Sequence, residues 1–247
     1  MLKKLPLLAG LLALTCAMPA AEARRLVLAA TEYPPYYSES LPAGGPVTEL
    51  TLAALHKAGY EVEVRFLPWA RALLLGQRGE VDGLIGVWHS PERELSFQFS
   101  QPVVANRIVL CRRAGGRGPS RFTSFSALKP YTVGVVRGYA NPPALAAARI
   151  RTEEVNDDLQ NLRKLVIGHV DLVLIDSRVE RHLVRNQRPD AEKTVQCLQP
   201  PVQEQPQYLV VSRSASDAAH VVADFNEQLK AMQESGEYAE IAARWGL

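Results

Sequence analysis

The fold class is predicted most clearly by residues 60–88, which read YEVEVRFLPWARALLLGQRGEVDGLIGVW. At the start of this stretch, apolar and charged residues alternate up to residue 66, which is the two-residue period of a strand with one buried face. The spacing from Trp69 to about Gly76 predicts a helix, and residues 81–87 form an apolar run that predicts a buried strand. A strand–helix–strand order places parallel strands in one sheet with a helix packed on it, so the sequence predicts an α/β fold.

Further elements precede this stretch. Residues 26–30 form a short apolar run that predicts a strand, and the run ends at a turn-rich segment, Tyr33-Pro34-Pro35-Tyr36. Pro46 stands where a proline opens a helix, and Gly59 stands where a glycine closes one. This alternation of strand and helix indicates a parallel or mixed sheet with helices on both faces.

A second series of elements follows residue 88. Its patterns predict strands at 108–111 and 131–136, a helix at 157–166, a strand at 170–175, a helix at 177–185, strands at 194–198 and 208–212, a long amphipathic helix from Ser216 to Gly236 and a short helix at 238–245. Two lobes of about 100 residues are expected rather than one large core, since domains cluster near that size. A cleft between two lobes is a usual place for a small ligand.

The composition is that of an ordinary globular protein and excludes several classes. The chain of 247 residues has 28 Lys and Arg against 26 Asp and Glu, and only 3 cysteines. This near balance of charge offers no electrostatic footprint for nucleic acid, and the cysteine count excludes a disulfide-dense scaffold. The histidines lack paired metal-ligand spacing, and the sequence has neither a GxSxG elbow nor a phosphate-binding glycine loop. We therefore expect no metal, no cofactor and no catalytic residue.

The N-terminus has the pattern of an export signal. Two lysines precede an apolar run at residues 5–17, and Ala21-Glu22-Ala23 has the small-x-small form of a cleavage site. Residues 1–23 are therefore predicted to be a cleaved signal peptide, because the run is shorter than the roughly 20 residues of a membrane-spanning helix. Export to an oxidising compartment favours a disulfide between Cys111 and Cys197, with two buried thiols as the alternative.

Several short motifs occur in a characteristic order along the chain. They are YPPY at 33–36, GEVDG at 79–83, ER at 92–93 with FQFSQP at 97–102, VGVVRGY at 133–139, GHVD at 168–171 with ID at 175–176, and SGEY at 235–238 with Trp245. Their order resembles the periplasmic solute-binding proteins of the polar amino-acid type, family 3 of the bacterial extracellular solute-binding proteins. The resemblance covers essentially the whole mature chain. It implies a type II periplasmic-binding-protein fold, in which two lobes, each a mixed sheet flanked by helices, are joined by two hinge strands. Lobe 1 would comprise residues 24–104 plus 207–247, and lobe 2 residues 105–206.

The resemblance implies one cation and one anion as ligand-binding residues. An arginine at the position of Arg93 grips the ligand carboxylate in amino-acid binders of this family, and a guanidinium suits this task because its paired donors match a carboxylate. The alternative is a surface arginine that pairs with Glu92 or Glu94. Asp176 falls where the family places a carboxylate that receives the ligand ammonium group, and the alternative is that it caps the helix starting at Ser177.

Four aromatic residues complete the predicted ligand-binding set. Tyr33 and Tyr36 resemble aromatics that pack on the ligand side chain, with anchoring of their own loop as the alternative. Trp88 and Tyr139 lie in stretches where many amino-acid binders carry Ser or Thr. The change replaces small donors with flat apolar surface, which suits an apolar or aromatic amino acid or a different carboxylate. Trp69 is expected in the core.

The implied function is non-enzymatic binding of a small solute, an amino acid or a related carboxylate, by a periplasmic monomer. The partner would be the membrane permease of an ABC importer. Two alternatives stay open. The closed lobes could signal to a membrane receptor, or the protein could resemble the exported cyclohexadienyl and arogenate dehydratases, for which Glu32 or Asp176 would offer the acid that the reaction needs.

Overall fold

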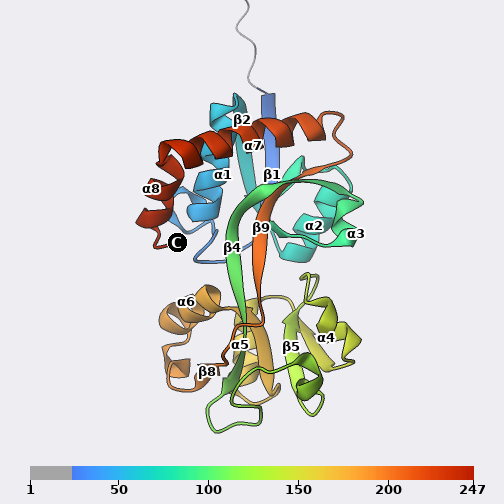
Figure 1. The fold of residues 1–247 in the computed structure, drawn as a ribbon, viewed down its shortest axis with the longest axis vertical. Helices are drawn as coiled ribbons and strands as arrows, with labels where there is room; N and C mark the ends of the chain where they lie inside the picture. The colour runs from blue at the N-terminus through green and yellow to red at the C-terminus, as the bar shows by residue number, and fades with distance from the viewer. Residues whose placement is uncertain (1–23) are drawn as a thin grey trace, which may run out of the picture.

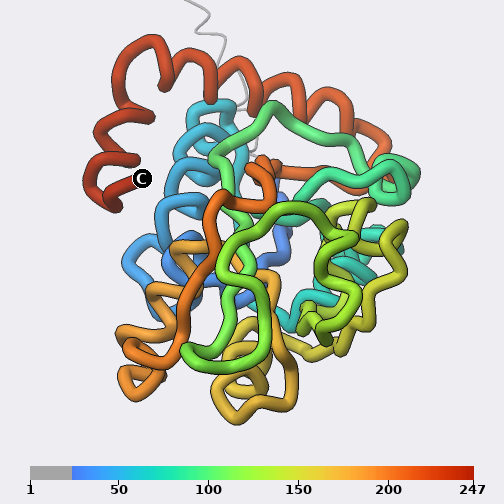
Figure 2. The backbone as a smooth tube through the Cα atoms, turned by 60° about the horizontal axis from the view of Figure 1, so that its bottom comes forward, coloured from blue at the N-terminus to red at the C-terminus, as the bar shows by residue number. Residues whose placement is uncertain are grey.

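The computed structural model describes residues 24–247, and the predicted signal peptide lies outside the described residues. The chain forms two lobes joined by a pair of long antiparallel strands, β4 (Phe97–Arg113) and β9 (Gln203–Ser212) (Figures 1 and 2). One continuous sheet runs through both lobes in the order β2-β1-β3-β9-β4-β7-β5-β6, with β8 paired to β4. The predicted two-lobed α/β fold is confirmed.

Lobe 1 contains the stretch that led to the fold prediction. Residues 60–88 form β2, α2 and β3, and β1 lies between the two strands in parallel with both. On the other side of β3 lies β9, which pairs antiparallel with it and continues the sheet toward β4. The elements are β1 (Arg24–Ala30), α1 (Pro46–Lys57), β2 (Tyr60–Phe66), α2 (Trp69–Gln77), β3 (Gly83–Trp88), α3 (Pro91–Glu94), α7 (Ala218–Ser235) and α8 (Glu237–Arg244), with a 3-10 turn at Pro42–Gly44.

Lobe 2 repeats the arrangement on a smaller scale. Its strands β5 and β7 run parallel to each other, and β6 is the parallel edge strand beside β5. The elements are β5 (Thr132–Val136), α4 (Pro143–Ala147), β6 (Arg151–Val155), α5 (Asp158–Val166), β7 (Leu172–Asp176), α6 (Ser177–Gln187) and β8 (Val195–Cys197), with 3-10 turns at Phe125–Leu128 and Pro189–Ala191.

The predicted disulfide is present in lobe 2. Cys111 on β4 lies directly opposite Cys197 on β8, and their sulfurs are bonded. The bond ties the short strand β8 to the strand that leads out of the hinge. Within residues 24–247, no helix is long and apolar enough to cross a membrane.

Candidate functional site

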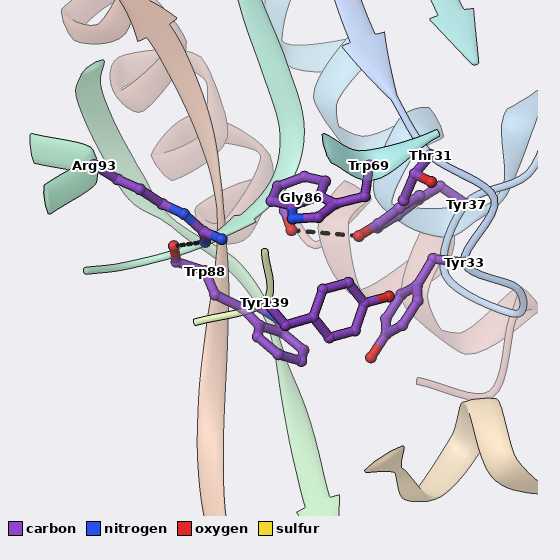
Figure 3. Close-up of a pocket in the computed structure, with 8 residues that line it drawn as sticks. All are labelled: Thr31, Tyr33, Tyr37, Trp69, Gly86, Trp88, Arg93 and Tyr139. Atoms are coloured by element: carbon purple, nitrogen blue, oxygen red, sulfur yellow. Dashed lines mark hydrogen bonds between the residues drawn. The ribbon is translucent and has the colours of Figure 1, made fainter. Parts of the chain in front are cut away.

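A small cavity lies where the two lobes meet, and five of the eight residues that line it are aromatic. Lobe 1 supplies seven of the residues around it and lobe 2 supplies one (Figure 3). They are Thr31, Tyr33, Tyr37, Trp69, Gly86, Trp88, Arg93 and Tyr139. The free space is about 10 Å³, which is enough for about one water molecule. In this state the side chains themselves fill the space between the lobes.

Arg93 supplies the positive charge of this site. It lies in the short helix α3, whose first turn is capped by Ser90, and it is only 5% exposed. Its guanidinium donates to the carbonyl oxygen of Trp88 in lobe 1 and, over 2.8 Å, to that of Gly138 in lobe 2. The guanidinium carbon lies 5.0 Å from the ring centre of Trp69. Burial lowers the pKa of Arg93 to about 10, so the side chain remains a cation at neutral pH.

Among residues 24–247, no carboxylate forms a salt bridge with Arg93. Its partners are two neutral carbonyl groups and an aromatic face. A buried charge normally has a charged partner, because desolvation is costly. The site therefore presents an uncompensated positive charge to the space between the lobes.

Five aromatic rings surround the cavity, and we call them the aromatic cage: Tyr33, Tyr37, Trp69, Trp88 and Tyr139. Their ring centres lie 5.0 to 6.3 Å apart in edge-to-face or tilted pairs. Such pairs add stabilisation beyond their buried area, and their faces suit flat apolar groups. The hydroxyl of Tyr33 is buried and has no hydrogen-bond partner in the described part of the chain.

Two cage residues, Tyr37 and Trp69, were not predicted to contact a ligand. Tyr37 fits only because Gly86 has a positive φ of 75° and lacks a side chain, since a Cβ there would lie 2.4 Å from the Tyr37 ring. The Tyr37 hydroxyl donates to the Gly86 carbonyl over 3.3 Å. Trp69 is buried as expected, but its indole nitrogen donates across the cleft to Gly138 over 2.9 Å. The sequence signals were a third tyrosine after YPPY and a glycine within an apolar strand.

Asp176 lies behind the cage and is held by the protein itself. It ends β7, caps α6 and is 1% exposed. One carboxylate oxygen accepts from the main-chain nitrogens of Arg178 and Val179. The other accepts from Tyr36, from the side chain of Asn106 and from the main chain of Arg107 over 2.8 to 3.1 Å. Helix capping is therefore one role of Asp176, and its contact with an ammonium group stays a prediction.

The predicted site residues thus fall into two groups. Arg93, Tyr33, Trp88 and Tyr139 come together around the cavity. Tyr36 does not line this cavity, because its hydroxyl points to Asp176 over 3.1 Å. A buried hydrogen-bond network joins the two groups: the indole of Trp88 and the amide of Gln207 both donate to Asn106, which donates to Asp176.

Asp158 is a buried carboxyl group that sequence reasoning missed. It opens α5, is 6% exposed and accepts the Tyr139 hydroxyl over 3.0 Å. Burial raises its pKa to about 7, and the nearby charges of Asp176 and Asp157 act in the same direction. In the sequence, Asp158 stands out only as a second aspartate at the start of the helix, where Asp157 already serves as the N-cap.

Replacing Asp158 with asparagine is expected to change how stability depends on pH. Its pKa is about 3.9 in an unfolded chain and higher in the fold, so the fold binds more protons between those values. Stability from this group is therefore lost as the pH rises from about 4 to about 7. Asp158→Asn removes the loss, and its free energy of unfolding should exceed the wild-type value by roughly 3–4 kcal/mol above pH 7.

Urea denaturation at pH 5 and pH 8 measures this effect. The gain in Asp158→Asn should be small at pH 5 and large at pH 8. Glu192→Gln is the control, because this exposed side chain is not among the groups that raise the pKa of Asp158. Parallel curves for wild type and Asp158→Asn would contradict the raised pKa.

The cavity is flanked by two wider clefts between the lobes. One, of about 700 Å³, lies between α2 and α3 on one side and the segment around Ala140 to Pro143 on the other. The second, of about 610 Å³, lies between the segment Phe66–Ala70 and the start of α5. Both clefts are open to solvent. Among residues 24–247, no group of three metal-ligating side chains occurs.

Comparison with known proteins supports the same fold. A histidine kinase sensor domain with similarity to periplasmic binding proteins superposes with a TM-score of 0.79 at 21% identity, over 91% of this chain and 96% of that one. The arginine-, lysine-, histidine-binding protein ArtJ from Geobacillus stearothermophilus superposes with a TM-score of 0.71 at 22% identity, over 90% and 95%. The ancestral amino-acid-binding protein AncCDT-1, a precursor of cyclohexadienyl dehydratase, superposes with a TM-score of 0.71 at 19% identity, over 90% and 95%.

No curated protein matches the sequence at a significant level. The sequence pattern of one family, however, matches almost the whole described chain, residues 26–247. The match agrees with the resemblance carried by the motifs between residues 33 and 245 and with the two-lobed fold. The chain therefore belongs to the bacterial extracellular solute-binding proteins, family 3.

Proposed function

We propose that the protein binds a small carboxylate solute between its lobes and delivers it to the membrane permease of an ABC importer. The observation that carries the proposal is the buried, uncompensated charge of Arg93. A carboxylate at this guanidinium would replace neutral carbonyl partners with an anion and form short, charge-assisted hydrogen bonds. An amino acid is one member of this ligand class.

The solute contacts that we propose come from both lobes. Arg93 would bind the carboxylate, and Tyr33 and Trp88 would pack on the rest of the molecule. If the solute carries an amine, Asp158 is better placed than Asp176 to receive it. Asp158 accepts one hydrogen bond, whereas the oxygens of Asp176 already accept five.

Closure of the lobes around the solute is the second part of the proposal. We assign residues 24–104 and 207–247 to lobe 1 and residues 105–206 to lobe 2, with the hinge in β4 and β9. The pairing of these strands shifts register between Phe99 and Val104, which supports bending at this place. The lobes would open to admit the solute and close again over it, and contacts from both lobes would form only in this second closed state, so binding would favour it.

Location and partner follow from the same proposal. The signal pattern at residues 1–23 supports export of a monomer to the periplasm. The likeness to the substrate binding protein of an amino acid ABC transporter supports a role in transport. The likeness to a histidine kinase sensor domain supports a membrane receptor as the second candidate partner.

A dehydratase activity is the enzymatic alternative, and Asp158 is the feature that favours it. A buried acid with a pKa of about 7 can donate a proton at neutral pH, as loss of water from a prephenate-like ring requires. The likeness to AncCDT-1 shows only that the fold occurs in an ancestor of such an enzyme.

A thermal-shift screen of amino acids and other small carboxylates tests the proposed function. A solute that binds only the folded state stabilises it by mass action and so raises the melting temperature. At a solute concentration of a hundred times the Kd, the free energy of unfolding increases by about 2.7 kcal/mol. We expect a shift with at least one carboxylate and none with its methyl ester or amide. Shifts only with uncharged compounds would contradict the proposal. Incubation with prephenate or arogenate, followed by detection of an aromatic product, tests the enzymatic alternative.

A further inference from the structure

The turn Gly138–Tyr139 of lobe 2 occupies the space where the proposed solute would bind. The Gly138 carbonyl oxygen accepts two hydrogen bonds from lobe 1, over 2.8 Å from Arg93 and 2.9 Å from the indole of Trp69. Gly138 has a positive φ of 75°, and a Cβ there would approach the Trp69 indole to 3.4 Å. A glycine therefore suits the close approach of this carbonyl to its two donors.

The ring of Tyr139 fills the aromatic cage beside these donors. Its centre lies 5.0 Å from Trp88, 6.2 Å from Tyr33 and 6.3 Å from Trp69, with the rings edge to face (Figure 3). The space that remains holds about one water molecule. A solute can therefore enter the cage only if Tyr139 leaves it.

The turn offers three groups to the site in a fixed order. The Gly138 carbonyl oxygen accepts a hydrogen bond from Arg93, the Tyr139 ring lies in the cage, and the Tyr139 hydroxyl donates to Asp158 over 3.0 Å. Three atoms, the amide nitrogen, Cα and Cβ of Tyr139, separate the carbonyl carbon from the ring. The same order in a small molecule describes a carboxylate joined through a short chain to a hydroxyaryl ring.

We propose that Gly138–Tyr139 is an internal surrogate ligand, which holds the carboxylate and aromatic subsites of lobe 1 until a hydroxyaryl carboxylate displaces it. This inference rests on the proposed function and names the class of its solute. A carboxylate competes well with the turn, because its hydrogen bonds to a guanidinium are stronger than those of a neutral carbonyl. Occupancy by the turn weakens the apparent binding of the solute. The apparent Kd equals the intrinsic Kd divided by the fraction of molecules in which the subsites are free.

The first test measures closure without any ligand. Spin labels at Gln77→Cys on α2 and Ala144→Cys on α4 lie on exposed positions of opposite lobes. In Tyr139→Ala the distance between the labels should lengthen, because the ring contacts with lobe 1 are lost. Tyr139→Phe keeps the ring and should retain the wild-type distance. Tyr131→Ala is the matched control, since Tyr131 lies in lobe 2 outside the cavity. An unchanged distance in Tyr139→Ala would overturn the inference.

The second test measures binding by calorimetry. The probes are 4-hydroxyphenylacetate, 3-(4-hydroxyphenyl)propionate and 4-(4-hydroxyphenyl)butyrate, which differ in the number of atoms between carboxylate and ring. Tyr139→Ala should bind its best probe about tenfold more tightly than wild type. This factor corresponds to the interaction energy of one or two aromatic pairs, which the solute no longer has to break. Tyr139→Phe keeps the ring pairs but loses the hydrogen bond to Asp158, so its affinity should fall between those of wild type and Tyr139→Ala. Tyr131→Ala should remain within about twofold of wild type. Equal affinity of wild type and Tyr139→Ala for all three acids, including no binding by either, would overturn the inference.

The two proposals fail in different ways. If a non-aromatic carboxylate binds through Arg93 and Tyr139→Ala does not improve the binding of hydroxyaryl acids, the proposed function stands and the surrogate role is wrong. If every solute that binds does so equally well after Arg93→Ala, the proposed function is wrong, whatever Tyr139→Ala does.

Discussion

Replacing Arg93 with alanine is expected to reduce the affinity for carboxylate solutes by at least about thirtyfold. Truncating one partner of a buried, hydrogen-bonded charge pair typically costs 2–5 kcal/mol of binding free energy, because the other charge is left without its partner. At about 1.4 kcal/mol per tenfold, this range corresponds to losses of roughly thirtyfold to several thousandfold. Calorimetry with the solute found in the thermal-shift screen measures the change.

Two variants sharpen the interpretation of the Arg93 result. Arg93→Lys keeps a charge but loses the planar pair of donors, so it should fall between wild type and Arg93→Ala. Arg71→Ala, on the exposed side of α2, should bind as the wild type does. Unchanged affinity in Arg93→Ala would remove this residue from the carboxylate site, provided that the variant unfolds at the wild-type urea concentration.

The second large effect is expected on stability rather than on binding. Asp176→Ala should lower the free energy of unfolding by at least about 3 kcal/mol, because each buried donor left without an acceptor costs about 1–3 kcal/mol. Five donors are affected: two main-chain groups at the start of α6, one on β4, the amide of Asn106 and the hydroxyl of Tyr36. Asp176→Asn retains one carbonyl oxygen and should lose less.

Urea denaturation of these variants checks the prediction. The matched control is Asp190→Ala, which removes an exposed aspartate whose partner is Arg188 and should leave stability close to the wild-type value. If Asp176→Ala costs as little as Asp190→Ala, the hydrogen bonds to Asp176 do not contribute as the structure indicates.

Much of the fold could be predicted because burial leaves a periodic mark on the sequence. Strand β7 and helix α7 were predicted from their apolar spacing, and both are confirmed within a few residues. Strand β6 was missed because it is an edge strand, RTEEV, in which only Val155 is buried. Strands β4 and β9 are longer than predicted, because their middle parts cross between the lobes and carry polar residues such as Asn106 and Gln207.

The candidate site could be predicted only in part. Family motifs pointed to Arg93, Tyr33, Trp88 and Tyr139, and the structure gathers these around one cavity. The sequence could not reveal Asp158, since two adjacent acids at a helix start look alike until one of them is buried. Nor could it reveal that the lobe 2 turn fills the site, because that contact joins residues 45 or more positions apart.

The α/β order and the family could be read from the sequence alone, because both depend on local spacing or on residue identity. The sequence also named the two cysteines that could pair, but their bond depends on the contact between β4 and β8. The partners of the buried charged groups, by contrast, can be seen only in the tertiary structure. Asp176 is saturated by five donors, whereas Arg93 faces neutral carbonyl groups and Asp158 accepts a single phenol. The physical reason is that desolvation and hydrogen bonding act through space. Their strength at a residue depends on atoms that the fold brings close to it from distant parts of the chain, as Tyr36 reaches Asp176 and Gly138 reaches Arg93.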